Sequence, residues 1–282
     1  MDDGYRLERL DPGSPAELAR VCALLRRVFP KARHLTERYL AWLYAANPAG
    51  SALGYNALAD DEIVGHLAAV PMAARIEGEP RLGMLLLNSA VDAAHRRRRL
   101  QSRMSDRMFE EAPQLGFAFC LSTGNRFSTP ALLTRLRMLR PVDAKLGLGM
   151  PVRRERRFRP SFERNWTAES LRWRLANPER RYSAHAAGNT LSVTAATGLL
   201  GIEALLYHGT NLPGLEESGP ARPGGLRVWL GLDPALSWPA SLPIPQRLRP
   251  SPLNLVYRDL SGGGFLPDPA RIVLSGLDFD AY

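Results

Sequence analysis

The sequence predicts an α+β fold, with a mixed, mostly antiparallel sheet flanked by helices and followed by a smaller, related half. Three observations support this prediction. Along residues 1–150, helical and strand-like segments alternate in the order strand, two helices, three strands, helix, strand, helix, strand. A charged, proline-containing segment follows at 151–165. Part of the helix–strand–strand pattern then recurs after residue 166.

The composition is that of a soluble globular protein, with 282 residues, 45% apolar and 23% charged. The formal charge is +9, and it comes almost entirely from arginine, because Lys31 and Lys145 are the only lysines. This charge is compatible with anionic ligands, nucleic acid or acidic membranes. Cys22 and Cys120 lie far apart, so we expect no disulfide framework and no metal site. The polar start and the absence of a long apolar run predict a cytoplasmic protein without a membrane span.

The first elements carry clear local signals. Residues 4–10 alternate as in a strand, and 13–29 form an amphipathic helix. In that helix Ser14 is the expected cap, Pro15 takes the first position, and Glu17 completes a capping box. A second helix is expected to end at Asn47-Pro48. Three strand-like runs come next, at 51–59, 62–76 and 81–91.

Two further helices and two strands complete the first half. Residues 99–116 form a helix with Leu100, Met104 and Met108 on one face, and a short buried strand follows at 117–123. Residues 128–139 are expected to form a helix with Thr129 as its cap and Pro130 at its first position. A last strand is expected at 140–150.

The predicted domains are residues 1–150, a basic linker at 151–165, and a diverged half at 166–282. The second half repeats a skeleton of the first, pairing Thr36, Leu40, Trp42, Asn47 and Pro48 with Thr167, Leu171, Trp173, Asn177 and Pro178. This indicates a duplicated unit, and the alternative is a coincidence between two amphipathic helices that end in Asn-Pro. Glu203, Tyr207 and His208 lie on a later strand, either lining an acceptor cleft or serving as plain sheet residues.

Four consecutive arginines, Arg96 to Arg99, separate a strand from a helix. A helix start presents free N–H groups and a positive dipole end, and arginines add guanidinium groups that grip phosphate oxygens. This placement indicates a phosphate-binding loop. The alternative is a solvated basic loop.

This layout resembles the GNAT superfamily of N-acyltransferases, in which the fourth strand is followed by the motif Q/R-x-x-G-x-G/A. Arg96 takes the Q/R place, Arg99 the first Gly place and Gln101 the second small-residue place. Asn125 resembles the asparagine after the family's fifth strand. The resemblance implies an acetyl-CoA or other acyl-CoA donor, held at Val91, Arg96, Arg97, Arg98, Arg99, Leu100, Gln101, Ser102 and Asn125. The family's oxyanion donor would be a backbone amide around Val91.

The sequence also departs from the family pattern. Arg99 carries a large side chain where glycine lets the backbone approach pyrophosphate. It either points away, replaces an amide contact with a guanidinium contact, or fills the site. Leu139-Arg140 stands where the family has Gly-Phe, and residues 128–139 lack the family's tyrosine acid.

Four residues are candidates for the chemistry of acyl transfer, which needs a base and an oxyanion stabiliser: His66, Asn88, Ser89 and Asp92. His66 has the alternative of a structural histidine, and Asp92 the alternative of an ion pair with arginine. Asn88 and Ser89 lie on a strand, so one of them is expected to face the cleft.

The resemblance implies transfer of an acyl group from acyl-CoA to a primary amine, such as an amino sugar or another small amine. An acyl carrier protein is an alternative donor. The alternatives from other classes are a non-catalytic GNAT-like binding protein and a nucleic-acid-binding protein. The latter would use Arg96 to Arg99 and the basic stretch 153–159.

Overall fold

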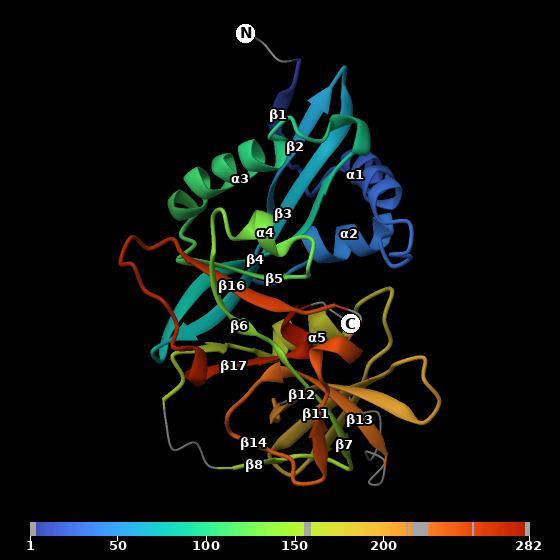
Figure 1. Cartoon of the computed structure of the whole chain (residues 1–282), viewed down its shortest axis with the longest axis vertical. Coiled ribbons are helices and arrows are strands. Elements are labelled where there is room, and N and C mark those ends of the chain that lie inside the picture. Colours follow the sequence, from blue (N-terminus) through green and yellow to red (C-terminus); the bar gives the residue numbers. More distant parts are fainter. Residues whose placement is uncertain (1–3, 155–158, 213, 216–224, 250, 280–282) are drawn as a thin grey trace.

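A computed structural model describes residues 4–154, 159–212, 214–215, 225–249 and 251–279 (Figure 1). The elements up to residue 141 are β1 (Arg6–Arg9), α1 (Pro15–Val28), α2 (Glu37–Tyr44), β2 (Leu53–Ala59), β3 (Glu62–Ile76), β4 (Glu79–Val91), α3 (Leu100–Glu111), β5 (Phe119–Gly124), α4 (Thr129–Leu132) and β6 (Arg137–Pro141). Single 3₁₀ turns occupy Ala93–His95 and Ala112–Leu115.

The later elements are mostly short strands. They are β7 (Asp143–Leu148), β8 (Val152–Arg153), β9 (Phe162–Arg164), α5 (Ala168–Leu175), β10 (Ser183–Ala187), β11 (Thr190–Ala196), β12 (Ile202–Thr210), β13 (Leu226–Leu232), β14 (Leu236–Ser237), β15 (Ser241–Pro243), β16 (Asn254–Asp259), β17 (Ile272–Ser275) and α6 (Gly276–Phe279). Further 3₁₀ turns lie at Gln246–Leu248 and Pro269–Arg271. No helix in the described part of the chain is long and apolar enough to cross a membrane.

The described strands confirm the predicted fold class. All but two of them, β8 and β14, join one 15-stranded sheet, in which only β4/β5, β9/β17 and β12/β13 are parallel pairs. The hairpin between β2 and β3 turns at Asp60 and Asp61, which both take positive φ. Asp and Asn are among the residues that tolerate this conformation in tight turns.

The two halves exchange strands. β16 lies between β5 and β6 in the sheet of the first half, and β7 pairs with β13 of the second half. The basic segment 151–165 contains β8 and β9, of which β9 pairs with β3 and β17. Residues 155–158 of this segment lie outside the described residues. The division into 1–150 and 166–282 stays a prediction about two units whose strands interleave.

The helix expected at 128–139 is wrong in its length. α4 ends at Leu132, and residues from Arg137 onward form β6. The physical reason is long-range pairing, because Arg137 and Met138 pair with Tyr257 and Val256 of β16. The cap also differs, since Ser128 is the N-cap residue and makes no side-chain cap bond.

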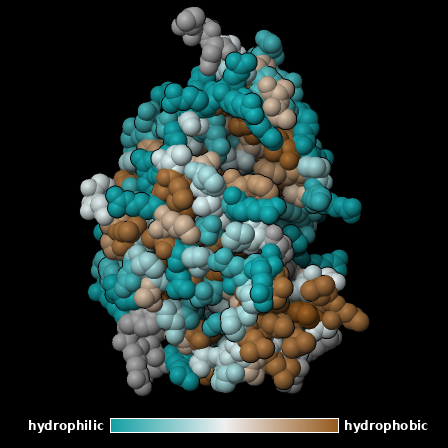
Figure 2. Space-filling model, viewed as in Figure 1, coloured by the Kyte–Doolittle hydropathy of each residue, from teal (hydrophilic) through white to brown (hydrophobic). Residues whose placement is uncertain are grey.

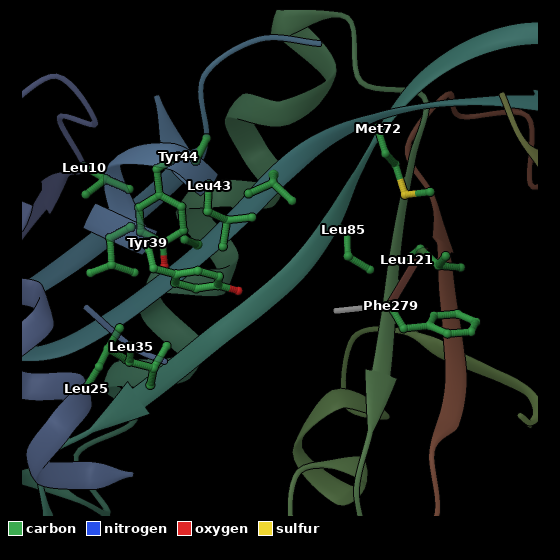
Figure 3. Close-up of a cluster of buried hydrophobic side chains, with 14 of the residues drawn as sticks. Leu10, Leu25, Leu35, Tyr39, Leu43, Tyr44, Met72, Leu85, Leu121 and Phe279 are labelled. Carbon is green, nitrogen blue, oxygen red and sulfur yellow. The ribbon is translucent and has the colours of Figure 1, made fainter. Parts of the chain in front are cut away.

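Two helical layers cover the first half of the sheet. Along β3, Leu67 and Ala69 pack in the cluster that contains Met104 of α3, whereas Ala68 and Val70 pack in the cluster of α1 and α2. This alternation follows from the two-residue period of a strand. Figure 3 shows the second of these clusters, with residues of α1 and α2 on one side and Met72, Leu85, Leu121 and Phe279 on the other.

The repeated skeleton forms a reciprocal contact between α2 and α5. Thr36 and Thr167 are the N-caps of the two helices, and their hydroxyls accept from Tyr39 N and Ser170 N. The rings of Trp42 and Trp173 stack with centroids 4.8 Å apart. Trp42 Nε1 donates to Trp173 O at 3.0 Å, and Trp173 Nε1 donates to Trp42 O at 3.2 Å. The two halves therefore meet through the tryptophan that occupies the same place in each occurrence of the skeleton.

The surfaces of the two halves differ. Figure 2 shows mainly hydrophilic residues over the upper half of the view and a hydrophobic area at its lower right. Exposed large hydrophobic residues of the second half include Leu199, Leu200 and Leu242.

Candidate active site

A cleft opens where β4 and β5 diverge. The two strands pair only at Met84–Cys120 and Leu85–Leu121, and no other described strand pairs with this edge of β4 beyond Leu85. The resulting cleft has a volume of about 990 Å³. It is lined by residues 85–91 of β4, by the loop and start of α3, by the end of β5, and by α4. A strand edge without a partner presents unpaired backbone N–H and C=O groups to a ligand.

A bulge in β4 shapes the wall of the cleft. His66 pairs with Ala90 and Ala68 pairs with Leu87, so Asn88 and Ser89 interrupt the ladder. Asn88 adopts φ 51°, a left-handed conformation that asparagine accepts better than most residues. Both Asn88 and Ser89 line the cleft. Bulges re-aim side chains in this way near functional sites.

The backbone amide of Val91 points into the cleft. Asp92 N donates to Val64 O on β3 at 2.8 Å, so Asp92 faces β3. Successive backbone groups of a strand point to opposite edges, which places the Val91 N–H and C=O on the unpaired edge. Arg96 Nε donates to Val91 O at 3.3 Å on that side. The Val91 amide is therefore available to a ligand in the cleft.

The arginine loop and the start of α3 form the mouth of the cleft. Arg97 and Arg99 adopt φ 65° and 57°, and Arg99 is the N-cap of α3 without a side-chain cap bond. The N–H groups of Leu100, Gln101 and Ser102 precede the first intrahelical bond, Arg103 N to Arg99 O. A left-handed conformation costs a residue with a Cβ about 1–2 kcal/mol, so two such arginines indicate a loop shaped for a task.

The mouth is cationic. Arg96, Arg97, Arg99 and His95 line it, and no aspartate or glutamate lines the cleft in the described part of the chain. Arg98 is exposed but is not part of the lining, so the structure separates it from its neighbours. Leu100, Gln101 and Ser102 do line the cleft. Among the described residues, no group of three or more His, Cys, Asp or Glu could hold a metal.

Asn125 lines the cleft and also organises α4. Its Oδ1 accepts from Phe127 N at 2.8 Å and Ser128 N at 2.9 Å. These bonds use the oxygen, so the Nδ2 group is the part of the side chain left to donate to a ligand.

His66 and Asp92 lie away from the cleft lining. His66 is fully buried on β3, and both its ring nitrogens have partners, Asn56 Oδ1 at 2.7 Å and the Tyr44 hydroxyl at 3.1 Å. Burial lowers the His66 pKa to about 3, so its imidazole is neutral at pH 7. Asp92 pairs with Arg27 at 3.2 Å, and its Oδ1 accepts from Ala94 N. This backbone bond, followed by the bond from Arg27, lowers the Asp92 pKa.

The structure adds lining residues that sequence reasoning missed. Phe29 follows α1, Leu253 precedes β16, and Phe279 ends α6, so the two halves together close the apolar wall. Ser122, Thr123 and Phe127 come from β5 and the loop after it. His95 directly precedes the four arginines, and that position was the signal in the sequence that could have indicated it. Its Nδ1 lies 3.0 Å from the Tyr5 hydroxyl.

The candidates on β12 lie elsewhere. Tyr207 and His208 line a second, separate cavity of about 270 Å³, whereas Glu203 pairs with Arg227 at 3.2 Å. Burial, followed by the nearby Arg153, lowers the His208 pKa to about 4.

A family model described as an acetyltransferase (GNAT) domain matches residues 9–128, the segment that contains β4, the arginine loop, α3 and β5. Residues 9–128 belong to the GNAT family. No curated protein matches the sequence.

Several solved structures share the fold of this chain over both of its halves. A probable N-acyltransferase from Enterococcus faecalis is similar with a TM-score of 0.65 and 11% identity, over 93% of this chain and 74% of that one. A GCN5-related N-acetyltransferase from Kribbella flavida has a TM-score of 0.60 and 12% identity, over 93% and 73% of the two chains. Eis1 from Mycobacterium abscessus has a TM-score of 0.60 and 10% identity, over 91% and 74%. At these identities the likeness shows the fold.

Proposed function

We propose that this protein transfers an acyl group from acyl-CoA to the nitrogen of a small primary amine, such as an amino sugar. The observation that carries the proposal is the mouth of the cleft, where the uncapped start of α3 meets Arg96, Arg97 and Arg99. Free helix N–H groups and guanidinium groups together bind phosphate oxygens. The likeness to a probable N-acyltransferase and to a GCN5-related N-acetyltransferase supports the same class of reaction.

The cleft fits an acyl-CoA donor along its length. The cationic mouth suits the pyrophosphate, and the unpaired edge of β4 offers backbone groups to the amides of a pantetheine arm. Asn125 offers its Nδ2 group nearby. The apolar side chains of Phe29, Leu253 and Phe279 suit an acyl chain. An arginine in place of the motif's glycine is compatible with this use, because Arg99 is exposed and its backbone already adopts the left-handed conformation.

The transfer proceeds by direct attack. The amine nitrogen forms a bond to the thioester carbon, the carbon–sulfur bond breaks, and the sulfur leaves as the thiolate of CoA. The Val91 N–H stabilises the negative charge that develops on the carbonyl oxygen. No Asp, Glu, Cys, Lys or Tyr side chain lines the described cleft, and its one lining histidine, His95, lies at the mouth beside the arginines that would bind the phosphates. Water therefore carries the proton from the attacking nitrogen to solvent. Asn88 and Ser89 present polar groups to the acceptor.

The test is a calorimetric titration of the purified protein with CoA, acetyl-CoA and a long-chain acyl-CoA. We expect binding that weakens roughly tenfold or more in Arg97→Ala, the range for losing a hydrogen bond to a charged group. Arg98→Ala is the matched control, because Arg98 is exposed but does not line the cleft. A screen of primary amines with acetyl-CoA then measures thiol release.

Two results would overturn the proposal. Binding that appears only in Arg99→Gly would mean that Arg99 fills the donor site and that the chain is a non-catalytic binding protein. Equal losses in Arg97→Ala and Arg98→Ala, together with DNA binding that CoA does not compete, would favour a nucleic-acid-binding function.

A further inference from the structure

A buried row of hydrogen-bonded side chains connects the outside of the sheet to the cleft. Asn56 Nδ2 donates to Glu17 Oε1 at 2.6 Å, and Asn56 Oδ1 lies 2.7 Å from His66 Nδ1. His66 Nε2 lies 3.1 Å from the Tyr44 hydroxyl. Asn88 Nδ2 donates to the same hydroxyl at 2.8 Å. These residues come from α1, α2, β2, β3 and β4, so the row crosses the first half of the fold.

The direction of every bond in this row follows from its first member. An ionised carboxylate only accepts hydrogen bonds, so Glu17 must receive the amide group of Asn56. The carbonyl oxygen of Asn56 then faces His66, whose Nδ1 must carry the proton. A neutral imidazole has one donor and one acceptor, so His66 Nε2 accepts from the Tyr44 hydroxyl.

Asn88 receives the orientation set by this row. The Tyr44 hydroxyl donates its hydrogen to His66 Nε2, so its oxygen is left to accept a hydrogen bond. Asn88 must therefore present Nδ2 to it. The Oδ1 atom of Asn88, in the same plane, then lies on the opposite side of the Cβ–Cγ axis from Nδ2. No described residue donates to this oxygen, and Asn88 lines the cleft beside the bulge. An acceptor atom is thus presented to whatever enters the cleft.

The surroundings hold the row rigid. Tyr44 and His66 are fully buried, and Asn56 is 2% exposed. Figure 3 shows the Tyr44 ring among leucine side chains of the apolar cluster. Burial keeps His66 neutral, which suits a fixed donor and acceptor rather than a group that takes up a proton. Buried polar groups are expensive unless they are hydrogen-bonded, and the side chains of Asn56, His66 and Tyr44 all have partners here.

We propose that Glu17, Asn56, His66 and Tyr44 are positioning residues that fix the carboxamide of Asn88, so that its Oδ1 accepts a hydrogen bond from an N–H of the acceptor amine. This inference rests on the proposed acyl transfer to an amine. It assigns a role to His66 other than that of a base, and it makes Asn88 a residue that favours amines with an N–H to donate over fully substituted amines.

The first experiment reads the orientation directly, without a ligand. Long-range ¹H–¹⁵N spectra of the full chain report which nitrogen of His66 carries the proton, and we expect Nδ1. Hydrogen exchange of the Asn88 side-chain amide, assigned by its loss in Asn88→Asp, should show one slowly exchanging proton. Tyr44→Phe should speed that exchange at least tenfold. Tyr39→Phe is the matched control, since Tyr39 is a buried tyrosine on the same helix outside this row.

The second experiment reads function. With acetyl-CoA and the amine found in the screen, Tyr44→Phe should lower kcat/KM for the amine on the order of 10²-fold, as misplacement of a reacting group does. The Kd for acetyl-CoA should stay within about twofold. Glu17→Gln should give a smaller loss of kcat/KM for the amine. A glutamine side chain can donate or accept, so this variant no longer fixes the direction of the hydrogen bonds but keeps every member of the row.

The results separate this inference from the proposed function. A proton on Nε2 of His66, or an Asn88 amide that does not respond to Tyr44→Phe, would overturn the inference even if CoA binds. A Tyr44→Phe protein that loses acetyl-CoA affinity as much as amine turnover would overturn it too. Failure of the wild-type protein to bind any acyl-CoA would instead remove the proposed function and, with it, the amine role of Asn88, while the spectra still decide its orientation.

Discussion

The two halves share part of their order of elements but differ in backbone conformation. In the first, α2 leads through β2 and β3 to β4, which pairs in parallel with β5; in the second, α5 leads through β10 and β11 to β12, which pairs in parallel with β13. All six described non-glycine residues with positive φ lie in the first half, between Asp60 and Arg99. In the second half the described positive φ values all belong to glycine. Asn88, Arg97 and Arg99 of these six line the cleft, and the other three lie in the turns at Asp60, Asp61 and Glu77.

The charges differ in the same way. The arginines at the mouth of the first cleft face no acidic lining residue in the described chain, whereas Arg153 at the smaller second cavity is paired with Asp233. The cavities measure about 990 and 270 Å³. The comparison shows that similar strand pairing in the two halves does not by itself produce similar cavities. The first cleft is distinguished by the loop after β4, with its left-handed arginines and no acidic residue in the described lining.

The largest expected effect tests whether the halves are joined as equivalent copies. Trp42→Ala should reduce the free energy of unfolding by about 3–5 kcal/mol, the range for truncating a buried tryptophan, and the half-buried Trp173 by less. Because each indole donates to the other's backbone, the double variant should show a coupling of about 0.5–3 kcal/mol in urea unfolding. Pairing Trp42→Ala with Trp238→Ala, in a different cluster, should be additive. Additivity in both pairs would contradict the reciprocal joint.

The next effect compares one buried histidine from each half. Burial lowers the pKa of His66 to about 3 and that of His208 to about 4, below the ordinary value of 6.5. Each folded histidine binds fewer protons than its unfolded form, so stability is full above pH 6.5 and is lost as the pH falls toward the folded pKa. The slope is up to about 1.4 kcal/mol per pH unit for each histidine.

The measurement is urea unfolding of the wild type, His66→Asn and His208→Asn between pH 7 and pH 4. Each variant should lose the part of the pH dependence of stability that its histidine contributes. In His66→Asn the loss of slope should extend to a lower pH, because His66 has the lower folded pKa. Unchanged slopes would show that the histidines are not buried as described.

A smaller effect tests the strained backbone of the first half. Arg99→Gly should raise the free energy of unfolding by about 0.5–1 kcal/mol, since glycine avoids the left-handed penalty but adds entropy to the unfolded chain. Arg99→Ala, which keeps the strain, serves as the control and should give no gain. If alanine stabilised the protein as much as glycine, charge repulsion among the arginines rather than backbone strain would be the cause.

The smallest effect concerns Asp92. Asp92→Asn keeps the cap on Ala94 and loses only a partly exposed ion pair with Arg27, so stability should change by about 0–1 kcal/mol. Amine turnover should stay within about twofold, because Asp92 does not line the cleft. A loss of kcat larger than tenfold would return Asp92 to the role of a base.

Local signals in the sequence predicted much of the first half. Ser14 caps α1 as expected, and Leu100, Met104 and Met108 are buried on one face of α3. The reciprocal part of the capping box did not form, because the carboxylate of Glu17 turns to Asp11 N and Asn56 instead of Ser14 N. Asn56 lies on β2, so the residues around α1 alone do not reveal this partner of Glu17.

The cleft could be predicted only in part. Position along the chain grouped Arg96 to Arg99, but the left-handed turns at Arg97 and Arg99 decide that Arg98 leaves the lining. Leu253 and Phe279 reach the cleft through strand exchange and through packing between halves, and no local periodicity encodes such contacts. The row from Glu17 to Asn88 joins five separate elements, so no local pattern in the sequence indicates it either.

The place of β16 between β5 and β6 has a consequence for how the molecule is made and dissected. During synthesis, β5 remains an open edge until residues 254–259 have left the ribosome, more than a hundred residues later. Such long-range closure slows folding and leaves an unpaired edge available to other chains. A fragment cut after the last strand of the first half would lack an interior strand of its own sheet. The first half, as a unit of sequence, is therefore not a unit of folding.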